Sequence, residues 1–374
     1  MPLTQRLPKP LIPLANIPFV ERQIAWLREA GVDHIILSLH YNAELFQRYF
    51  AQKTPDVAIS FAIEDTPLGT GGAIKNCAPF LRADRLYICN GDIFTTLNLP
   101  DMLRMHRDNG AHISIALNEV DDPSRFGVIE TDADGRIHTF TEKPPRHLAR
   151  SHDINAGIYI FERDVLDHFP DGPCSVERDI FPELLRAEMP MHGYREQPYW
   201  TDLGTPGDYL QAHRDILDGR VRIALGTREI LPGIWAGERV EIADDALLRP
   251  PLLIGEGARI NRGATIGPRT VLGRGVTVQP YARVEDSIIW EGARVLRDSV
   301  VISSVIGRYA QAGGRVTAGL CGDGGQLLGV AGGQAEAASA RETSGAFLNR
   351  RPPSAPREDG QPVLAVPCRR HFTL

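Results

Sequence analysis

The sequence predicts an α/β protein in which a doubly wound, mostly parallel sheet is followed by a left-handed parallel β-helix. Its 374 residues exceed the length of one ordinary domain, so we expect two domains. Residues 1–218 alternate apolar, strand-like runs with amphipathic helical stretches, as doubly wound sheets do. Residues 240–310 instead carry an apolar residue at every sixth position, which is typical of a parallel β-helix.

The composition argues against several classes of protein. With 43% hydrophobic and 24% charged residues it is that of a globular protein, and the formal net charge of −6 disfavours nucleic acid or an anionic membrane as partner. No apolar run has the length of a membrane span, and the first residues lack the apolar core of a signal peptide. The cysteines are far apart, which disfavours a disulfide framework or a zinc site and predicts a cytoplasmic protein. They are Cys77, Cys89, Cys174, Cys321 and Cys368.

The first region contains alternating candidate strands and helices. Pro18 is placed to start a helix that Gly31 ends. The strand-like runs are residues 34–40, 57–64, 85–92 and 111–120, with a helical stretch at 42–51 and a glycine-rich turn at 68–73 that opens into another helix. Because ligands of doubly wound sheets bind at the carboxyl ends of strands, Asp92, which ends the 85–92 run, is a candidate site residue.

The second region repeats with a period that neither an α-helix nor a simple strand has. The repeating apolar residues are Ile242, Leu248, Ile254, Ile260, Ile266, Leu272, Val278, Val284, Trp290, Leu296 and Ile302. Residues 219–239 are expected to link the two domains. Residues 320–374 lose the pattern, and because short runs such as LLGV and PVLAVP are too small to form a core, we expect a disordered tail there.

Several residues of the first region are candidates for chemistry. Asp92 and Asp202 are carboxylates at strand ends, and such a pair can hold Mg²⁺ between nucleotide phosphates. Spacing alone favours a simpler interpretation, with Asp202 as a helix cap and Asp92 as a turn residue. The glycines of LGTGGA allow the backbone to approach a base or a phosphate, although tight turns need glycine too. Lys9 and Lys143, each beside proline, are two of only four lysines in the chain.

A series of motifs in one order carries a family resemblance. The series is PKPLIPLAN, LGTGGA, NGD, RFGVIE, EKP, NAGIY, SVERDIFPEL and WTDLGTPGDYLQAH. In this order the motifs resemble the sugar-1-phosphate nucleotidyltransferases, also called NDP-sugar pyrophosphorylases, and they are most similar to the mannose-1-phosphate guanylyltransferase branch. The resemblance covers residues 2–218, and a hexapeptide β-helix also occurs in that branch.

The resemblance implies an activity and a site. The chain would transfer a nucleotidyl group from a nucleoside triphosphate, with GTP expected, to a sugar 1-phosphate such as mannose 1-phosphate, and would release pyrophosphate. Mg²⁺ would be the cofactor, bound by Asp92 and Asp202. The nucleotide would contact Lys9, Leu68, Gly69, Thr70, Gly71, Gly72 and Asp92, and the sugar phosphate would contact Gly127, Glu142, Lys143, Asn155 and Gly157. Lys9, Asp92 and Asp202 would serve catalysis by positioning the substrates and neutralising charge, without a protein nucleophile.

The first residues depart from the family pattern. The family opens with a buried strand and a loop of the form G-x-G-T-R-x-x-P-L-T, of which only Pro2-Leu3-Thr4 matches here. We expect a start upstream of Met1 rather than a real truncation. For the chain as given we expect impaired catalysis, and unpaired strands around the central place of the absent first strand.

Alternatives to this activity differ in their support. A non-catalytic regulatory subunit would keep the sugar-nucleotide pocket as a sensor, which the absent loop favours and the two metal carboxylates disfavour. Glucose 1-phosphate or a heptose phosphate could replace mannose 1-phosphate. An acyltransferase is disfavoured because its β-helix would need a histidine base, and no histidine lies between His213 and His371. We expect the β-helix to join copies of the chain in a homo-oligomer.

Overall fold

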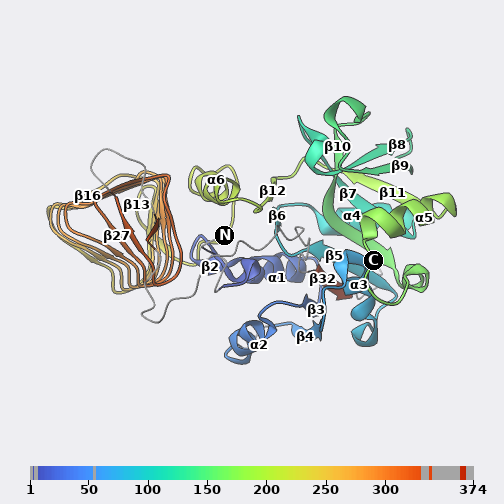
Figure 1. Cartoon of the computed structure of the whole chain (residues 1–374), viewed down its shortest axis with the longest axis horizontal. Helices are drawn as coiled ribbons and strands as arrows, with labels where there is room; N and C mark the ends of the chain where they lie inside the picture. Colours follow the sequence, from blue (N-terminus) through green and yellow to red (C-terminus); the bar gives the residue numbers. More distant parts are fainter. Residues whose placement is uncertain (1–2, 4–6, 54–55, 330–336, 339–362, 368–374) are drawn as a thin grey trace, which may run out of the picture. The chain divides into compact units, whose positions relative to one another are not determined.

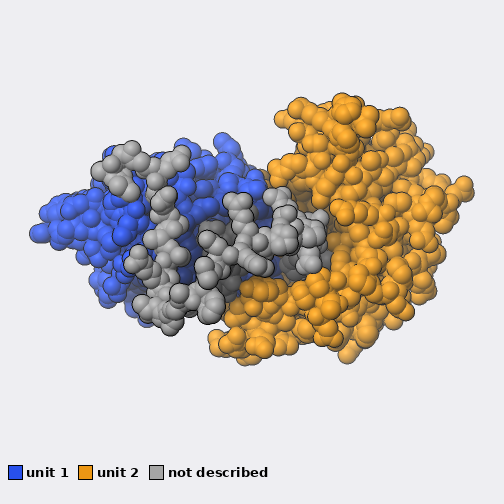
Figure 2. Space-filling view, viewed as in Figure 1, with its two compact units in different colours: residues 1–21, 203–355 blue, residues 22–202, 356–374 orange. Residues whose placement is uncertain are grey.

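The computed structural model describes residues 3, 7–53, 56–329, 337–338 and 363–367. The chain divides into two compact units, which Figure 2 colours separately. One consists of residues 22–202 with 356–374 and holds a mixed α/β sheet. The other consists of residues 1–21 with 203–355 and holds a solenoid of short strands (Figure 1).

One nine-stranded sheet forms the centre of the α/β unit. Its strands are β3 (His34–Leu39), β4 (Ala58–Ile63), β5 (Arg85–Asn90), β7 (Ile113–Glu119), β8 (Gly127–Thr131), β9 (Ile137–Glu142), β10 (Asp153–Glu162), β11 (Met191–Arg195) and β32 (Val363–Pro367). They follow the order β11-β7-β10-β5-β32-β3-β4, and β8 pairs with β9 and β10. β4, β3, β5, β7 and β11 run in one direction, whereas β10 and β32 run antiparallel to their neighbours. The α/β fold is confirmed, but the expectation of a mostly parallel sheet is wrong, because among the described strands of this sheet only β3 with β4 and β7 with β11 pair in parallel.

Residues that favour helix starts and stops bound several of the helices. α1 (Phe19–Glu29) follows Pro18, and Gly31 after it has a φ of +84°, a conformation that suits glycine. The side chain of Asn98 accepts a hydrogen bond from the Asp101 N–H at the start of α4 (Leu99–Asp108). The other helices of the α/β unit are α2 (Ala43–Ala51), α3 (Gly69–Asn76) and α5 (Phe181–Arg186), and two short strands, β6 (Ile93–Thr95) and β12 (Trp200–Asp202), pair with each other.

β32 departs from two expectations. Its backbone lies between β5 and β3 (Figure 1), with Leu364 opposite Cys89 on one side and Ala365 opposite Ile36 on the other. The sequence predicted unpaired strands at a central place of the sheet, and it predicted that PVLAVP would stay outside any core. Both expectations are wrong as regards the backbone, because this segment forms a strand that pairs with β3 and β5. The remainder of the expected tail, residues 330–336, 339–362 and 368–374, lies outside the described residues.

The solenoid consists of parallel strands stacked in three sheets. The first stack is β14 (Ile234–Ala236), β17 (Leu252–Ile254), β20 (Thr270–Leu272), β23 (Ile288–Ile289), β26 (Val305–Ile306) and β29 (Leu320–Cys321). The second is β15 (Glu241–Ile242), β18 (Arg259–Ile260), β21 (Thr277–Val278), β24 (Arg294–Val295), β27 (Gln311–Gly313) and β30 (Gln326–Leu328). The third is β16 (Leu247–Leu248), β19 (Thr265–Ile266), β22 (Arg283–Glu285), β25 (Val300–Ile302) and β28 (Arg315–Thr317). β13 (Arg228–Leu231) and β31 (Ala337–Ala338) pair antiparallel at the two ends.

The six-residue repeat sets the register of the first turns. Ile242 pairs with Ile260 and Ile260 with Val278, three repeats apart, which confirms the parallel β-helix. Beyond Val284 each turn is shorter, because Val278 pairs with Val295 and Val284 with Val301. The core positions there are the fully buried Val295 and Val301, whereas the expected Leu296 and Ile302 are only partly buried. The strands also continue to Leu328, beyond the boundary expected near residue 310.

The segment before α1 and the helix before the solenoid complete the second unit. They comprise a short turn at Lys9–Leu11, β1 (Pro13–Leu14), β2 (Ile17–Pro18) and α6 (Pro206–Leu217). Thr205 and Asp208 cap α6 reciprocally, each side chain accepting a hydrogen bond from the other residue's backbone N–H. No helix in the described part of the chain is both long and apolar enough to span a membrane. The four cysteines among the described residues are free thiols.

Candidate active site

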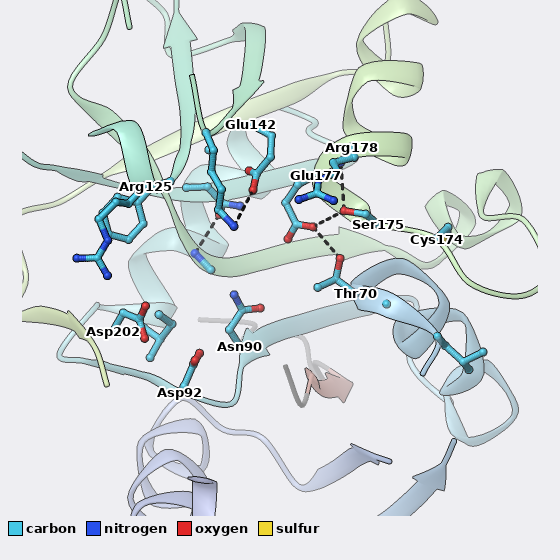
Figure 3. A pocket seen from close by; sticks show the side chains of 18 of the residues that line it. Thr70, Asn90, Asp92, Arg125, Glu142, Cys174, Ser175, Glu177, Arg178 and Asp202 are labelled. Carbon is cyan, nitrogen blue, oxygen red and sulfur yellow. Dashed lines mark hydrogen bonds and ion pairs between the residues drawn. The ribbon is translucent and has the colours of Figure 1, made fainter. Parts of the chain in front are cut away.

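A cavity of about 410 Å³ opens in the α/β unit beyond the carboxyl end of β5. This is where the sequence placed a ligand site, since ligands of doubly wound sheets bind outside the carboxyl ends of strands. Ten of the residues expected at the site line it: Leu68, Gly69, Thr70, Asp92, Gly127, Glu142, Lys143, Asn155, Gly157 and Asp202. The structure therefore brings together segments that lie far apart in the sequence (Figure 3).

Asp92 and Asp202 meet because β6 and β12 pair antiparallel. Asp202 lies directly opposite Ile93, and Asp92 immediately precedes Ile93. Figure 3 shows the two carboxylates turned toward one another at one wall of the cavity. The amide of Gln23 donates hydrogen bonds to the carbonyl oxygens of Asn90 and Ile93, at 3.0 and 3.3 Å, and so holds the loop that carries Asp92. Asp92 is only 1% exposed, so this loop presents a carboxylate inside the protein rather than at a solvated turn.

The glycines of LGTGGA allow the start of α3 to pack directly against the backbone of residues 172–174. The N–H of Gly71 donates to the carbonyl oxygen of Cys174 at 2.9 Å, and the N–H of Cys174 donates to the carbonyl oxygen of Leu68 at 3.0 Å. A Cβ at Gly69 would lie 2.6 Å from that Cys174 oxygen, and one at Gly72 would lie 2.5 Å from the oxygen of Gly172. Glycine is therefore required for the close approach. Gly71 and Gly72 are buried behind the cavity and do not line it, unlike the three residues before them.

Glu177 connects this loop to the opposite wall. One of its carboxylate oxygens accepts hydrogen bonds from the hydroxyls of Thr70 and Ser175, at 2.7 and 2.9 Å. The N–H of Val176 donates in turn to the Thr70 hydroxyl oxygen at 2.9 Å. These bonds, drawn in part in Figure 3, fix the side of the cavity expected to hold the base.

Glu142 and Lys143 lie on the wall formed by β8 and β9. The Lys143 ammonium is 3.4 Å from a Glu142 carboxylate oxygen. Burial raises the pKa of Glu142 above its ordinary value, and the nearby positive charge of Lys143 opposes that rise. Gly127 allows the two strands to close here, because a Cβ on it would lie 2.5 Å from the ring of Phe140. The wall thus offers an acceptor and a cation side by side.

Asn155 enters the cavity at an irregularity of β10. The register between β10 and β7 shifts between Asn155 and Tyr159. The Asn155 amide donates to the Tyr159 hydroxyl at 2.8 Å, and its oxygen accepts from the N–H of Gly157 at 2.9 Å. Gly157 has a φ of +73°, and a Cβ there would lie 2.7 Å from the Asn90 amide nitrogen. The hydrogen bonds at this irregularity orient Asn155. Gly157 leaves room there for the side chain of Asn90, at the end of β5.

One residue expected at the site, Lys9, does not line the cavity, and the cavity has lining residues to which the sequence analysis gave no role. Lys9 begins the turn Lys9–Leu11 in the other compact unit, so its contact with a phosphate stays a prediction. Ten lining residues were given no role from the sequence: Asn90, Ile93, Arg125, Phe126, Pro173, Cys174, Ser175, Glu177, Arg178 and Trp200. These residues fall within or beside the motifs NGD, RFGVIE, SVERDIFPEL and WTDLGTPGDYLQAH. Their position in the motifs was therefore a signal from which most of them could have been predicted as site residues.

Residues 1–219 match the family model described as Nucleotidyl transferase, which is more than half of the chain. The chain belongs to the nucleotidyl transferase family. Residues 248–321, within the solenoid, match the model described as GMPPB C-terminal domain. The sequence-based resemblance is confirmed at the level of the family by these two matches, and the chain is a nucleotidyltransferase with an added β-solenoid.

Relatives of this nucleotidyl transferase align over most of both chains. A mannose-1-phosphate guanylyltransferase of Mycobacterium tuberculosis is 35% identical over 306 residues, which cover 80% of this chain and 79% of the relative. A UTP–glucose-1-phosphate uridylyltransferase of Synechocystis is 31% identical over 327 residues, covering 82% and 84%. A crystal structure titled as a putative glucose-1-phosphate thymidylyltransferase from Bacillus anthracis superposes with a TM-score of 0.52 at 20% identity, over 59% of this chain and 90% of that one. The last comparison shows a shared fold.

Enzymes of this family generally use a divalent metal ion, and the cavity contains a donor set that fits one. Asp92 and Asp202 supply carboxylate oxygens at one wall, which are the ligands that hard divalent cations prefer. Among the described residues no group of three or more His, Cys, Asp or Glu side chains forms a complete cage for a metal. A pair of carboxylates fits an ion that takes its other ligands from phosphates and water, as Mg²⁺ does at nucleotide sites.

Proposed function

We propose that the chain transfers a GMP group from GTP to mannose 1-phosphate, in a Mg²⁺-dependent reaction that yields GDP-mannose and pyrophosphate. The observation that carries the proposal is the convergence on one cavity of Asp92 and Asp202, the α3 loop, and the pair Glu142 and Lys143. The name of the Mycobacterium tuberculosis relative supports guanine and mannose as the base and the sugar.

In the proposed reaction a phosphate oxygen of the sugar 1-phosphate attacks the α-phosphorus of the triphosphate, and the bond to pyrophosphate breaks. The attacking group is already an anion, so the protein needs to position it and to neutralise charge rather than supply a nucleophile. Lys143 would hold the sugar phosphate, and Glu142 and Asn155 would bond sugar hydroxyls. Asp92 and Asp202 would hold Mg²⁺, which when bound neutralises charge on the phosphates.

The proposal includes further assignments, for the nucleotide, for the assembly of the protein and for its location. Lys9 would contact the nucleotide phosphates, and Leu68, Gly69 and Thr70 would line the base pocket, with Gly71 and Gly72 supporting them from behind. Copies of the chain would associate through the β-solenoid. The protein would act in the cytoplasm, in keeping with the free thiols of its described cysteines.

The experiment measures pyrophosphate release from two substrate pairs, GTP with mannose 1-phosphate and UTP with glucose 1-phosphate. We expect the first pair to be preferred. Asp92→Asn and Asp202→Asn should each lower the rate by on the order of 10²-fold or more, because each removes a charge that holds the metal. Asp121→Asn is the control, since Asp121 is exposed and does not line the cavity. Full activity in either site variant would remove the metal assignment, and a preference for the second pair would replace the substrates.

The regulatory-subunit alternative has its own outcome in the same assay. The protein is assayed in two versions, the chain that begins at Met1 and an extended chain in which a family loop of the form G-x-G-T-R-x-x precedes Pro2. The extension is included because the arginine of that loop is expected at the reacting phosphates. Pyrophosphate release by the extended version would support the enzyme. Binding of GDP-mannose by calorimetry, with no release by either version from either substrate pair, would favour a sensor that does not catalyse.

A further inference from the structure

The cavity of the α/β unit carries more acidic than basic side chains, although its proposed substrates are anions. Among the described residues that line it are four carboxylates but only three cations. The three cations are Arg125, Lys143 and Arg178. Like charges repel one another at short range, so a phosphate can approach these carboxylates only where a cation is free to meet it.

Two of the three cations already face a carboxylate of the protein. The Lys143 ammonium is 3.4 Å from a Glu142 carboxylate oxygen. The positive charge of Arg178 acts on Glu142 as well, since burial raises the pKa of this carboxyl and both cations oppose the rise. Arg125 differs from them, because it is exposed at the cavity and forms no ion pair with any other residue that the structure describes.

The local structure around Arg125 aims its side chain without neutralising it. Arg125 ends the short turn Pro123–Arg125, and the side chain of Asp122 caps that turn by accepting a hydrogen bond from the N–H of Ser124. The guanidinium carbon of Arg125 lies over the ring of Phe126, 5.9 Å from the ring centre. A contact of this kind orients an arginine and leaves its N–H groups available. Figure 3 shows the Arg125 side chain on the same side of the cavity as Asp202.

The ring of Phe126 is itself anchored to the strand that presents Asp202. It packs edge to face against Trp200, with 5.7 Å between the ring centres and 74° between the planes. The indole N–H of Trp200 donates to the carbonyl oxygen of Ala156 at 3.0 Å. Because Trp200 begins β12 and Asp202 ends it, the support of Arg125 and the expected metal ligand share one short strand.

The backbone of Phe126 fixes the second cation. Its carbonyl oxygen accepts a hydrogen bond of 3.0 Å from the N–H of Lys143. Lys143 has a φ of +47°, a conformation that residues with a side chain rarely adopt and that persists only where the surroundings enforce it. One residue therefore sets the positions of both Arg125 and Lys143, through its ring and through its carbonyl group.

We propose that Arg125 is a further substrate-binding residue, which binds the phosphate of the sugar 1-phosphate together with Lys143, and that Phe126 positions the two cations. The inference rests on the proposed function, which gives that phosphate to Lys143. The planar guanidinium can donate two parallel hydrogen bonds to phosphate oxygens, whereas an ammonium acts as a point charge. The pair would thus hold the attacking phosphate near the metal site and offset the charge of the nearby carboxylates.

Calorimetric titration of mannose 1-phosphate into the full chain tests Arg125. Arg125→Gln should weaken binding by about tenfold or more, and Arg125→Lys should recover most of that loss because it restores the charge. Arg146→Gln is the matched control, since Arg146 lies 4.0 Å from Asp122 and does not line the cavity. We expect its affinity to stay within about twofold of the parent, as on an exposed site. GTP with Mg²⁺ is the second ligand, and its affinity should be the same in all variants.

Three results would overturn the role of Arg125. They are unchanged binding of mannose 1-phosphate by Arg125→Gln, an equal loss with Arg146→Gln, and an equal loss of GTP affinity. The same titrations with glucose 1-phosphate separate this inference from the proposed function. A parent that binds only glucose 1-phosphate would contradict the proposed substrate, and the variants would then decide on Arg125 with that ligand. A parent that binds neither sugar phosphate would overturn both proposals.

The positioning role of Phe126 has its own test. Phe126→Leu should weaken mannose 1-phosphate binding by about three- to tenfold without changing GTP affinity, and Phe126→Tyr, which keeps the ring, should bind as the parent does. Phe169→Leu is the control, because Phe169 is buried against Phe161, at 6.2 Å between ring centres, and does not line the cavity. It should lower the free energy of unfolding and leave both affinities unchanged. Parent-like binding by Phe126→Leu, or an equal loss with Phe169→Leu, would overturn this role.

Discussion

The Thr70 hydroxyl donates a hydrogen bond of 2.7 Å to a carboxylate oxygen of Glu177, which lies 107 residues further along the chain. The same Thr70 oxygen accepts from the N–H of Val176, and the same Glu177 oxygen accepts from Ser175. Two walls of the cavity are therefore joined by a closed set of hydrogen bonds in a partly buried place. Bonds to a charged group in such a place are the stronger kind.

Thr70→Val should weaken this connection while keeping the shape of the side chain. The change leaves a partly buried carboxylate and one backbone N–H each short of a partner, at a cost of about 1–3 kcal/mol in the free energy of unfolding. It should also weaken GDP-mannose binding, because the α3 loop loses its support. Urea unfolding and calorimetry measure the two effects. Thr277→Val on solenoid strand β21 makes the same chemical change where no cavity wall depends on it, and an equal loss there would refute the special role of Thr70.

Gly157→Ala tests the close approach at the end of β5. Its Cβ would lie 2.7 Å from the Asn90 amide nitrogen and 3.2 Å from a side-chain carbon of Ile93, so the Asp92 loop would have to move. Gly110 is a matched control, because it also has a positive φ, +57°, but nothing lies within 4 Å of its would-be Cβ. Gly110→Ala should cost only the backbone strain, about 1–2 kcal/mol. Gly157→Ala should cost more, and it should also lower Mg²⁺-dependent activity; matching losses in both variants would contradict the steric argument.

The parts of the site that the sequence predicted are those that short motifs encode locally. LGTGGA needs its glycines for contacts that involve only one facing segment, and Asp92 follows directly from the end of a recognisable strand. Glu177 was missed as a site residue because its role depends on Thr70, far away in the sequence, and no local pattern states which residues will meet.

The errors in the fold have the same physical origin. PVLAVP is a short apolar run with no period to read, so no local pattern indicates that its backbone pairs with β3 and β5. In the solenoid, the sequence predicts that the six-residue repeat continues past Val284, because the apolar residues Trp290, Leu296 and Ile302 have the same spacing by chance. The turn through Asp286, with a φ of +48°, shortens the register by one residue and moves the core to Val295 and Val301.

His106 should make the stability of the α/β unit depend on pH. Burial lowers the pKa of His106 to about 4 from an ordinary value of 6.5, although its hydrogen bond to Glu162 acts in the opposite direction. The neutral ring is satisfied, since Ser114 and Glu162 lie at its two nitrogens at 2.8 and 3.2 Å. The folded state binds the proton less well than the unfolded state does. The contribution of neutral His106 to the free energy of unfolding is therefore complete above about pH 6.5. As the pH falls toward 4 this contribution is lost, and the free energy of unfolding falls by about 3 kcal/mol.

Urea unfolding between pH 7 and pH 4 measures this loss. His106→Gln keeps a donor and an acceptor but cannot titrate, so its unfolding free energy should fall by about 3 kcal/mol less over that range than that of the parent. His138→Gln changes an exposed histidine and should leave the pH dependence of the parent intact. Identical pH slopes for the parent and His106→Gln would show that other groups govern the acid transition.

Trp290 should stabilise the solenoid unit through one buried hydrogen bond. Its indole N–H donates to the Tyr209 hydroxyl of α6 at 3.0 Å, and that hydroxyl donates to the carbonyl oxygen of Pro13. Trp290 is 1% exposed, so Trp290→Phe removes the indole donor and leaves a small void inside the protein. We therefore expect the free energy of unfolding to fall by about 2–4 kcal/mol. Trp235→Phe, at a half-buried position of β14, is the matched control and should cost less than half as much. Circular dichroism at the strand signal follows both transitions without relying on tryptophan fluorescence. If the two variants unfold at the same urea concentration, the bond from Trp290 to Tyr209 does not tie α6 to the solenoid.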